Sequence, residues 1–169
     1  MMRKVFILLF VMIVSMLQLG IFSNIQVISG KIDLIMLGVI AWILQKKTGI
    51  TDILIYVITS VLILYFISAE PVVILLAFYG LMSVSIYWVK NNIQQIPIVS
   101  MLFSTAIFTF AHLAIFGVYL QLAGVQLEAN EVFQTVILPS MLFNLIAAIP
   151  MFLLSNELQH LVYPYVEEI

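Results

Sequence analysis

Cysteine is absent from this sequence, and charged residues are scarce, at only 8% of the chain. Without cysteine the chain forms no disulfide, has no thiol chemistry and offers no thiolate to a metal. A soluble domain carries about 25% charged residues, so water would solvate a surface this poor in charge badly. The net charge of -2 gives no indication of nucleic-acid binding. These absences point away from a soluble enzyme or a nucleic-acid-binding protein and toward the lipid bilayer.

Hydrophobic residues are abundant instead. They make up 64% of the 169 residues, and the mean hydropathy is +1.25. The bilayer core favours such side chains and disfavours charge. A membrane-spanning helix needs about 20 apolar residues, so six helices with short loops would use the chain as one domain. The composition predicts an all-α integral membrane protein; a soluble protein buried inside a complex is the alternative that these numbers disfavour.

Turn signals divide the chain into six apolar segments. Lys46-Lys47-Thr48-Gly49 and Glu70-Pro71 mark turns, and Pro97 suits the first position of a helix. The first segment follows Arg3 and Lys4, as in a signal peptide, but it is long and lacks a small-residue cleavage site. The second segment is short, and the pattern allows the mixed stretch 23–31 to re-enter the membrane. We predict six transmembrane helices and a polar tail, over residues 5–22, 33–45, 52–68, 71–89, 97–123 and 132–154, with the tail over 155–169.

Basic residues give the predicted orientation, because lysine and arginine gather on the cytoplasmic side. With the N-terminus in the cytoplasm, five of the six lie inside: Arg3, Lys4, Lys46, Lys47 and Lys90. Only Lys31 then lies outside. Trp42 and Trp88 stand just before inside lysines, where an aromatic belt would place them. Both signals predict that the N-terminus and the C-terminus are cytoplasmic.

Polar side chains are few within the predicted helices. His112 is the one titratable residue deep in a helix, and that helix offers no acidic or cysteine partner at ligand spacing, so we predict no metal site. We expect His112 to be hydrogen-bonded between helices. The amides of Gln18 and Asn144 should face another helix, in this chain or in a partner subunit, because lipid would leave them unpaired. Asp33 stands near a helix start, where a carboxylate meets unpaired N–H groups.

Two prolines flank Asn144 in the last predicted helix. Pro139 and Pro150 each remove a backbone N–H and crowd the preceding turn, which predicts a kinked helix. The sequence has no phosphate-binding loop, no nucleophile elbow and no carboxylate pair on one helix face. We therefore predict no catalytic residue, cofactor or metal. The candidates for structural or partner contacts are Gln18, Asp33, His112, Pro139, Asn144 and Pro150.

Several short motifs occur in a recognisable order. They are Leu17-Gln18 late in the first helix, Asp33-Leu34-Ile35 at the start of the second, the turn Lys46-Lys47-Thr48-Gly49, and Ile137-Leu138-Pro139-Ser140 followed by Asn144 and Ala148-Ile149-Pro150. In this order and spacing the chain resembles the rod shape-determining protein MreD family of bacteria. Members of that family are small, very hydrophobic proteins with about six spans. Their fold is similar to that of the substrate-binding subunits of energy-coupling-factor transporters.

The resemblance implies a non-enzymatic scaffold subunit of the cell-wall elongation complex in the bacterial cytoplasmic membrane. Its implied partners are MreC and, through the same complex, RodA, a class B penicillin-binding protein and MreB filaments. The alternative is a solute-binding subunit of an energy-coupling-factor vitamin transporter, which a retained vitamin or a polar pocket near the outer face would favour. A small membrane protein that binds lipid or another subunit is the third interpretation.

Overall fold

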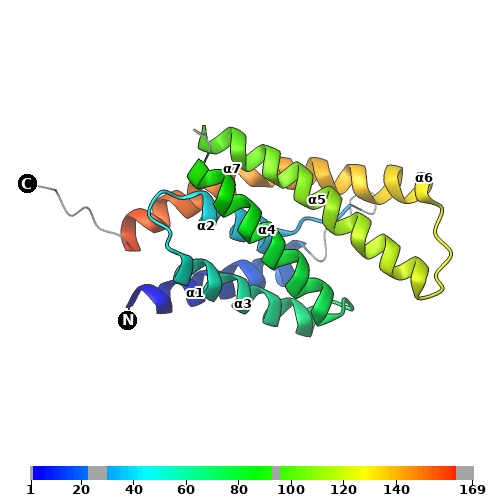
Figure 1. Ribbon diagram of the computed structural model, residues 1–169, viewed down its shortest axis with the longest axis horizontal. Helices are drawn as coiled ribbons and strands as arrows, with labels where there is room; N and C mark the ends of the chain where they lie inside the picture. Colours follow the sequence, from blue (N-terminus) through cyan, green and yellow to red (C-terminus); the bar gives the residue numbers. More distant parts are fainter. Residues whose placement is uncertain (1, 23–29, 93–95, 163–169) are drawn as a thin grey trace, which may run out of the picture.

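The computed structural model describes residues 2–22, 30–92 and 96–162, and these residues form a bundle of six helices without a strand (Figure 1). In chain order the elements are α1 (Met2–Leu17) continued by the π-helix η1 (Gln18–Phe22), α2 (Leu34–Leu44), α3 (Ile50–Ile67), α4 (Val72–Asn92), α5 (Pro97–Leu122), and a last helix made of α6 (Ala129–Val132), the π-helix η2 (Phe133–Ile137) and α7 (Leu138–Val162). Most of the stretch that the sequence allows to re-enter the membrane, residues 23–29, lies outside the described residues.

Among the residues that the structure describes, four helices are long and apolar enough to cross a membrane: α3, α4, α5 and the last helix over Ala129–Leu161. The prediction of an all-α bundle of membrane helices is confirmed to that extent. The apolar stretch Lys4–Gly20 and α2 are shorter. With 11 residues, α2 is only about 16 Å long, roughly half of the ~30 Å hydrocarbon layer. Six complete spans therefore stay a prediction.

The short helix α2 lies in the middle of the bundle, and every residue from Leu34 to Leu44 is buried. It contacts α1, α3, α4, α5 and α7. A helix that is apolar on all sides is stable only where other elements surround it. The longer helices therefore pack around α2, which forms the centre of the hydrophobic core.

Trp42 belongs to this core, so its predicted place in an aromatic belt is wrong. Its side chain is 1% exposed. Its ring centroid lies 5.7 Å from that of Phe10 and 5.8 Å from that of Tyr56. Trp88, on the outer helix α4, is 59% exposed. The two tryptophans differ because the sequence position before a lysine does not reveal that other helices enclose α2.

The first and last helices share one end of the bundle. Figure 1 shows the start of α1 and the end of α7 at that end, as a topology with both termini on one side requires. The C-terminal end of α2 lies there too, since Gln159, near the end of α7, donates a hydrogen bond to Thr48, just after α2. Lys90 Nζ donates a hydrogen bond to the Gln45 carbonyl at 2.6 Å. A cation at this position complements the unpaired carbonyls of a helix C-terminus. Which side of the membrane this end faces stays a prediction.

The last helix differs from its predicted form. It ends at Val162 rather than at residue 154, so the predicted polar tail begins too early. Ser155 and Gln159 are buried and continue the inward-facing positions of α7 at helical spacing. The π-helical turn η2 precedes Pro139, whose ring and missing N–H disturb a regular α-helix. Pro150 lies inside α7.

Gly38 of α2 faces the hydroxyl of Tyr56 on α3, and a Cβ added at Gly38 would collide with that oxygen. We expect Gly38→Ala to lower the free energy of unfolding by about 1–3 kcal/mol, as overpacking of a core does. The Tyr56 hydroxyl is buried and has no hydrogen-bond partner among the described residues, so Tyr56→Phe should cost little and should rescue Gly38→Ala.

Titration of the detergent-solubilised protein with SDS measures these stabilities. Gly80→Ala is the matched control, because a Cβ there meets nothing within 4 Å. Equal stability of the two alanine variants would contradict the packing described for Gly38.

Candidate functional site

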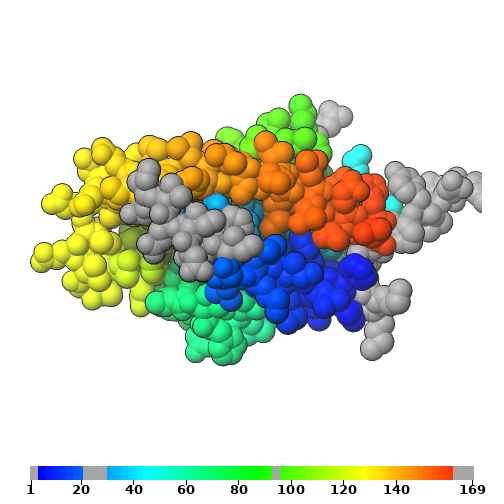
Figure 2. Space-filling view, turned by 180° about the vertical axis from the view of Figure 1, so that it is seen from behind, coloured from blue at the N-terminus to red at the C-terminus, as the bar shows by residue number. Residues whose placement is uncertain are grey.

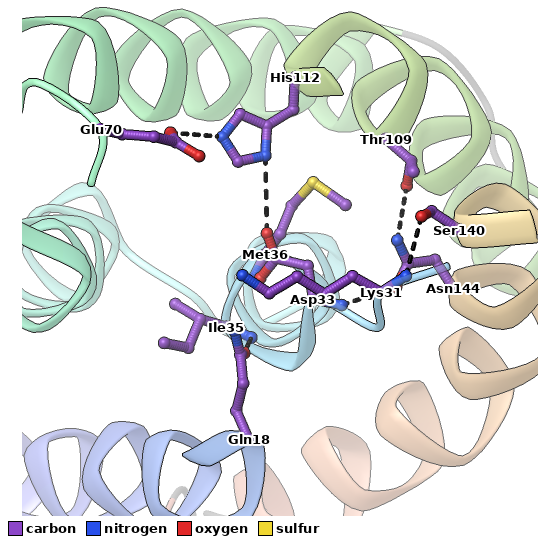
Figure 3. Close-up of polar contacts among 10 residues, drawn as sticks. All are labelled: Gln18, Lys31, Asp33, Ile35, Met36, Glu70, Thr109, His112, Ser140 and Asn144. Carbon is purple, nitrogen blue, oxygen red and sulfur yellow. Dashed lines mark hydrogen bonds and ion pairs between the residues drawn. The ribbon is translucent and has the colours of Figure 1, made fainter. Parts of the chain in front are cut away.

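The first turn of α2 lies inside the bundle, where it needs partners for its backbone N–H groups. The first four N–H groups of a helix have no acceptor within the helix. Here side chains supply acceptors: Gln18 Oε1 accepts from Ile35 N at 3.0 Å, and Asp33 Oδ1 accepts from Met36 N at 2.9 Å (Figure 3). Asn144 Oδ1 accepts from Asp33 N at 2.8 Å. Because an unpaired buried group costs about 1–3 kcal/mol, these three side chains fix the start of α2.

Helix α7 brings two polar side chains to this place. Ser140 Oγ accepts a hydrogen bond from Lys31 N at 2.9 Å. Asn144 Nδ2 donates to Thr109 Oγ1 of α5 at 3.2 Å. Ser140 and Asn144 are four residues apart and share one face of α7, and both are buried. Asn144 therefore connects α2, α5 and α7 through one amide.

We call the hydrogen-bonded side chains around the start of α2 the polar centre: Gln18, Asp33, Thr109, Ser140 and Asn144. Pro139 lies beside the polar centre, whereas Pro150 does not belong to it. A Cβ at Gly30 would come within 2.8 Å of Pro139 Cβ and 3.0 Å of the Phe143 ring. The absence of a side chain at Gly30 thus lets the segment before α2 pass close to α7. Pro150 lies further along α7 and is exposed.

His112 of α5 lies between two carboxylates from different parts of the chain. Its Nε2 atom is 3.0 Å from Glu70 Oε2, and its Nδ1 atom is 3.6 Å from Asp33 Oδ2. The three side chains are 12–15% exposed. Phe78 stacks on the imidazole, with ring centroids 4.6 Å apart. A neutral imidazole can donate to one carboxylate and an imidazolium to both, so the cluster can hold a proton.

A cavity of about 230 Å³ opens beside these residues. Its polar wall consists of Lys31, Asp33, Glu70, Thr109, His112 and Asn144, and its apolar wall of Met36, Leu113, Phe116 and Val136. In the predicted topology the cavity lies on the outer side. Within the described part of the chain, no group of three or more histidine, aspartate and glutamate residues is arranged to hold a metal. The cavity offers hydrogen bonds and charges of both signs to a small polar group.

The structure brings together four of the six candidates from the sequence: Gln18, Asp33, His112 and Asn144 (Figure 3). Glu70 was not among the candidates, because in the sequence it marks only a turn. The sequence offers one signal for Glu70: it is a carboxylate on the same predicted side as Asp33, in an otherwise apolar hairpin. The signal is weak, since nothing in the sequence connects Glu70 with His112.

Comparisons with models of known families, with curated proteins and with solved structures found no match for this chain. Its function is therefore inferred from its residues and their geometry.

Proposed function

We propose that the chain is a non-enzymatic scaffold subunit of the bacterial cell-wall elongation complex, similar to MreD, which docks an MreC-like protein in the cytoplasmic membrane. Through that partner it would join RodA, a class B penicillin-binding protein and MreB. One observation carries the proposal: three of the motifs on which the resemblance rests, those that contain Gln18, Asp33 and Ser140 with Asn144, meet at the polar centre. Gln18, Asp33 and Asn144 are far apart in the sequence, yet all three accept hydrogen bonds from the first residues of α2 and its N-cap.

This convergence matters because single motifs of two or three residues are weak signals. Four acceptor side chains serve one short segment: Gln18 from η1, Asp33 itself, and Ser140 and Asn144 from α7. Such a set is required jointly, since each acceptor satisfies a different N–H group in a buried or part-buried hydrogen bond. The order of the motifs then reflects one structural arrangement, which supports a common fold with the MreD family and, through it, the scaffold function.

Co-purification tests the proposal. An affinity-tagged chain expressed in its native cells and extracted in mild detergent should recover the MreC-like protein in about equal amount. An unrelated tagged multi-pass protein of the same membrane is the control. Recovery of no more MreC-like protein than with this control would refute the scaffold function.

A second candidate function is favoured by the cavity. A polar pocket on the predicted outer side is the feature expected of a solute-binding transporter subunit, and Asp33, Glu70, His112 and Lys31 line one. Its volume of about 230 Å³ is below the ~300–1,000 Å³ usual for small-molecule pockets, so a compact solute fits it better than a vitamin. Mass spectrometry of the purified protein tests this function: a small molecule at one copy per chain, lost in Asp33→Asn, would support it.

A further inference from the structure

The helices of the bundle differ in length. Helix α3 has 18 residues and α4 has 21, which gives lengths of about 27 and 32 Å, close to the ~30 Å hydrocarbon layer. Helix α5 has 26 residues, and the last helix has 33 over Ala129–Leu161, so these are about 39 and 50 Å long. A bilayer that matches α3 and α4 leaves part of α5 and of the last helix outside.

Side-chain contacts show at which end the extra length lies. At the end of the bundle that holds Lys46, Lys47 and Lys90, Gln159 Nε2 donates a hydrogen bond to Thr48 Oγ1 at 2.6 Å. The last helix therefore finishes level with the connection between α2 and α3. At the other end, the contact of His112 with Glu70 places the connection between α3 and α4 level with the middle of α5. The ten residues of α5 after His112, residues 113–122, therefore extend about 15 Å further.

The last helix matches this extension. Ser140, which binds Lys31 N, is level with the approach to α2, so the helical residues 129–139 also lie beyond that level. We call residues 113–139 the outer hairpin. Figure 1 shows it reaching past α3 and α4, and Figure 2 shows its yellow tip as the end of the molecule.

The outer hairpin has an unusual surface for a segment outside lipid. Large hydrophobic side chains are exposed on it, and Leu122 is the most exposed at 84%; the others are Ile115, Val118, Val125, Phe133 and Leu138. Outside the bilayer a group of exposed apolar residues marks a protein-binding surface. Lipid does not account for them, because raising the bilayer to the tip would place Lys31, Asp33 and Glu70 at hydrocarbon depth, where charges are costly.

Charge at this end indicates the kind of partner. Glu128 and Glu131 are exposed on the outer hairpin, and Asp33 and Glu70 lie at its base. Lys31 is the one lysine that the structure describes at this end; Lys4, Lys46, Lys47 and Lys90 are at the other. An acidic surface attracts and orients a basic partner.

We propose that the outer hairpin docks a basic, amphipathic segment of a partner protein just outside the membrane. The apolar side chains of that segment pack on Val118 and Leu122, and its cationic side chains pair with Glu128 and Glu131. The proposal rests on the scaffold function and names the surface it uses: the segment belongs to the MreC-like protein.

Site-specific photocrosslinking tests this in the full-length chain, co-expressed with the MreC-like protein. A photoreactive residue at position 122 should crosslink to a basic segment of that protein, and one at Leu62, which is also exposed on the outside of α3, should not. Charge reversal by Glu128→Lys with Glu131→Lys should lower recovery of the partner about tenfold, and Glu157→Lys at the opposite end should leave it unchanged.

The outcomes separate the two proposals. If the wild-type chain recovers no MreC-like protein, the scaffold function and the docking surface both fail. If recovery is normal but position 122 crosslinks only to lipid and charge reversal changes recovery less than twofold, the docking surface alone is refuted.

Discussion

Asn144→Leu is expected to lower the free energy of unfolding by about 2–4 kcal/mol. Leucine has a similar size, so the loss comes from hydrogen bonds rather than from a cavity. The substitution removes the acceptor for Asp33 N and the donor to Thr109 Oγ1. Each buried group left without a partner costs about 1–3 kcal/mol, and the two bonds join three helices.

Fluorescence offers a specific readout for this variant. Trp42 is buried in α2, whereas Trp88 is exposed, so in a Trp88→Phe background the emission reports the environment of α2. Titration with SDS should move the Asn144→Leu transition to a lower detergent fraction. Asn156→Leu makes the same chemical change three turns later on α7, at a half-buried position, and should shift the transition much less. Equal transitions for the two variants would contradict the role of Asn144 as a cap of α2.

Most of the helices could be predicted because lipid imposes a simple rule on the sequence. Apolar runs of sufficient length must be helical, since backbone groups find no partner in hydrocarbon. Breaks such as Glu70-Pro71 and Pro97 then mark where helices end, and α3, α4 and α5 lie close to their predicted bounds. The last helix shows where the rule fails: Ser155 and Gln159 are polar but buried, so hydropathy falls where the helix continues.

The arrangement of the helices could not be predicted in the same way. In a membrane, a residue that faces lipid and one that faces another helix are both apolar, so hydropathy did not reveal that α2 is enclosed or that Trp42 is in the core. Polar residues carried the usable information, because an amide or a carboxylate needs a partner. Gln18, Asp33 and Asn144 could therefore be selected from the sequence. Glu70 could not, because it is 42 residues from His112 and lies at a turn where charge is ordinary.

Glu70→Ala is expected to destabilise the protein by about 3 kcal/mol, because it removes the hydrogen-bond partner of His112 Nε2 and leaves that largely buried nitrogen unpaired. His112→Phe should also destabilise it, because both carboxylates lose their contact with the imidazole, although the phenyl ring can still stack on Phe78. The double variant should lose about 1–3 kcal/mol less than the sum of the single losses. Glu128→Ala, at an exposed position, is the control and should change stability by less than about 0.5 kcal/mol. Additive losses in the cycle would show that Glu70 and His112 do not interact.

The same variants separate the two candidate functions, because each function uses Glu70 differently. In a scaffold, Glu70 acts only by holding the connection between α3 and α4 against α5. Recovery of the partner by Glu70→Gln, which retains a hydrogen bond to His112, should then follow the folded fraction and stay close to that of the wild type. In a solute-binding subunit the charge itself contacts the ligand in the cavity, so the same variant would stay folded and still lose the bound molecule. Suppose that the folded Glu70→Gln protein keeps its partner, and that neither it nor the wild type carries a solute. Glu70 and the residues around it then serve the architecture of a scaffold.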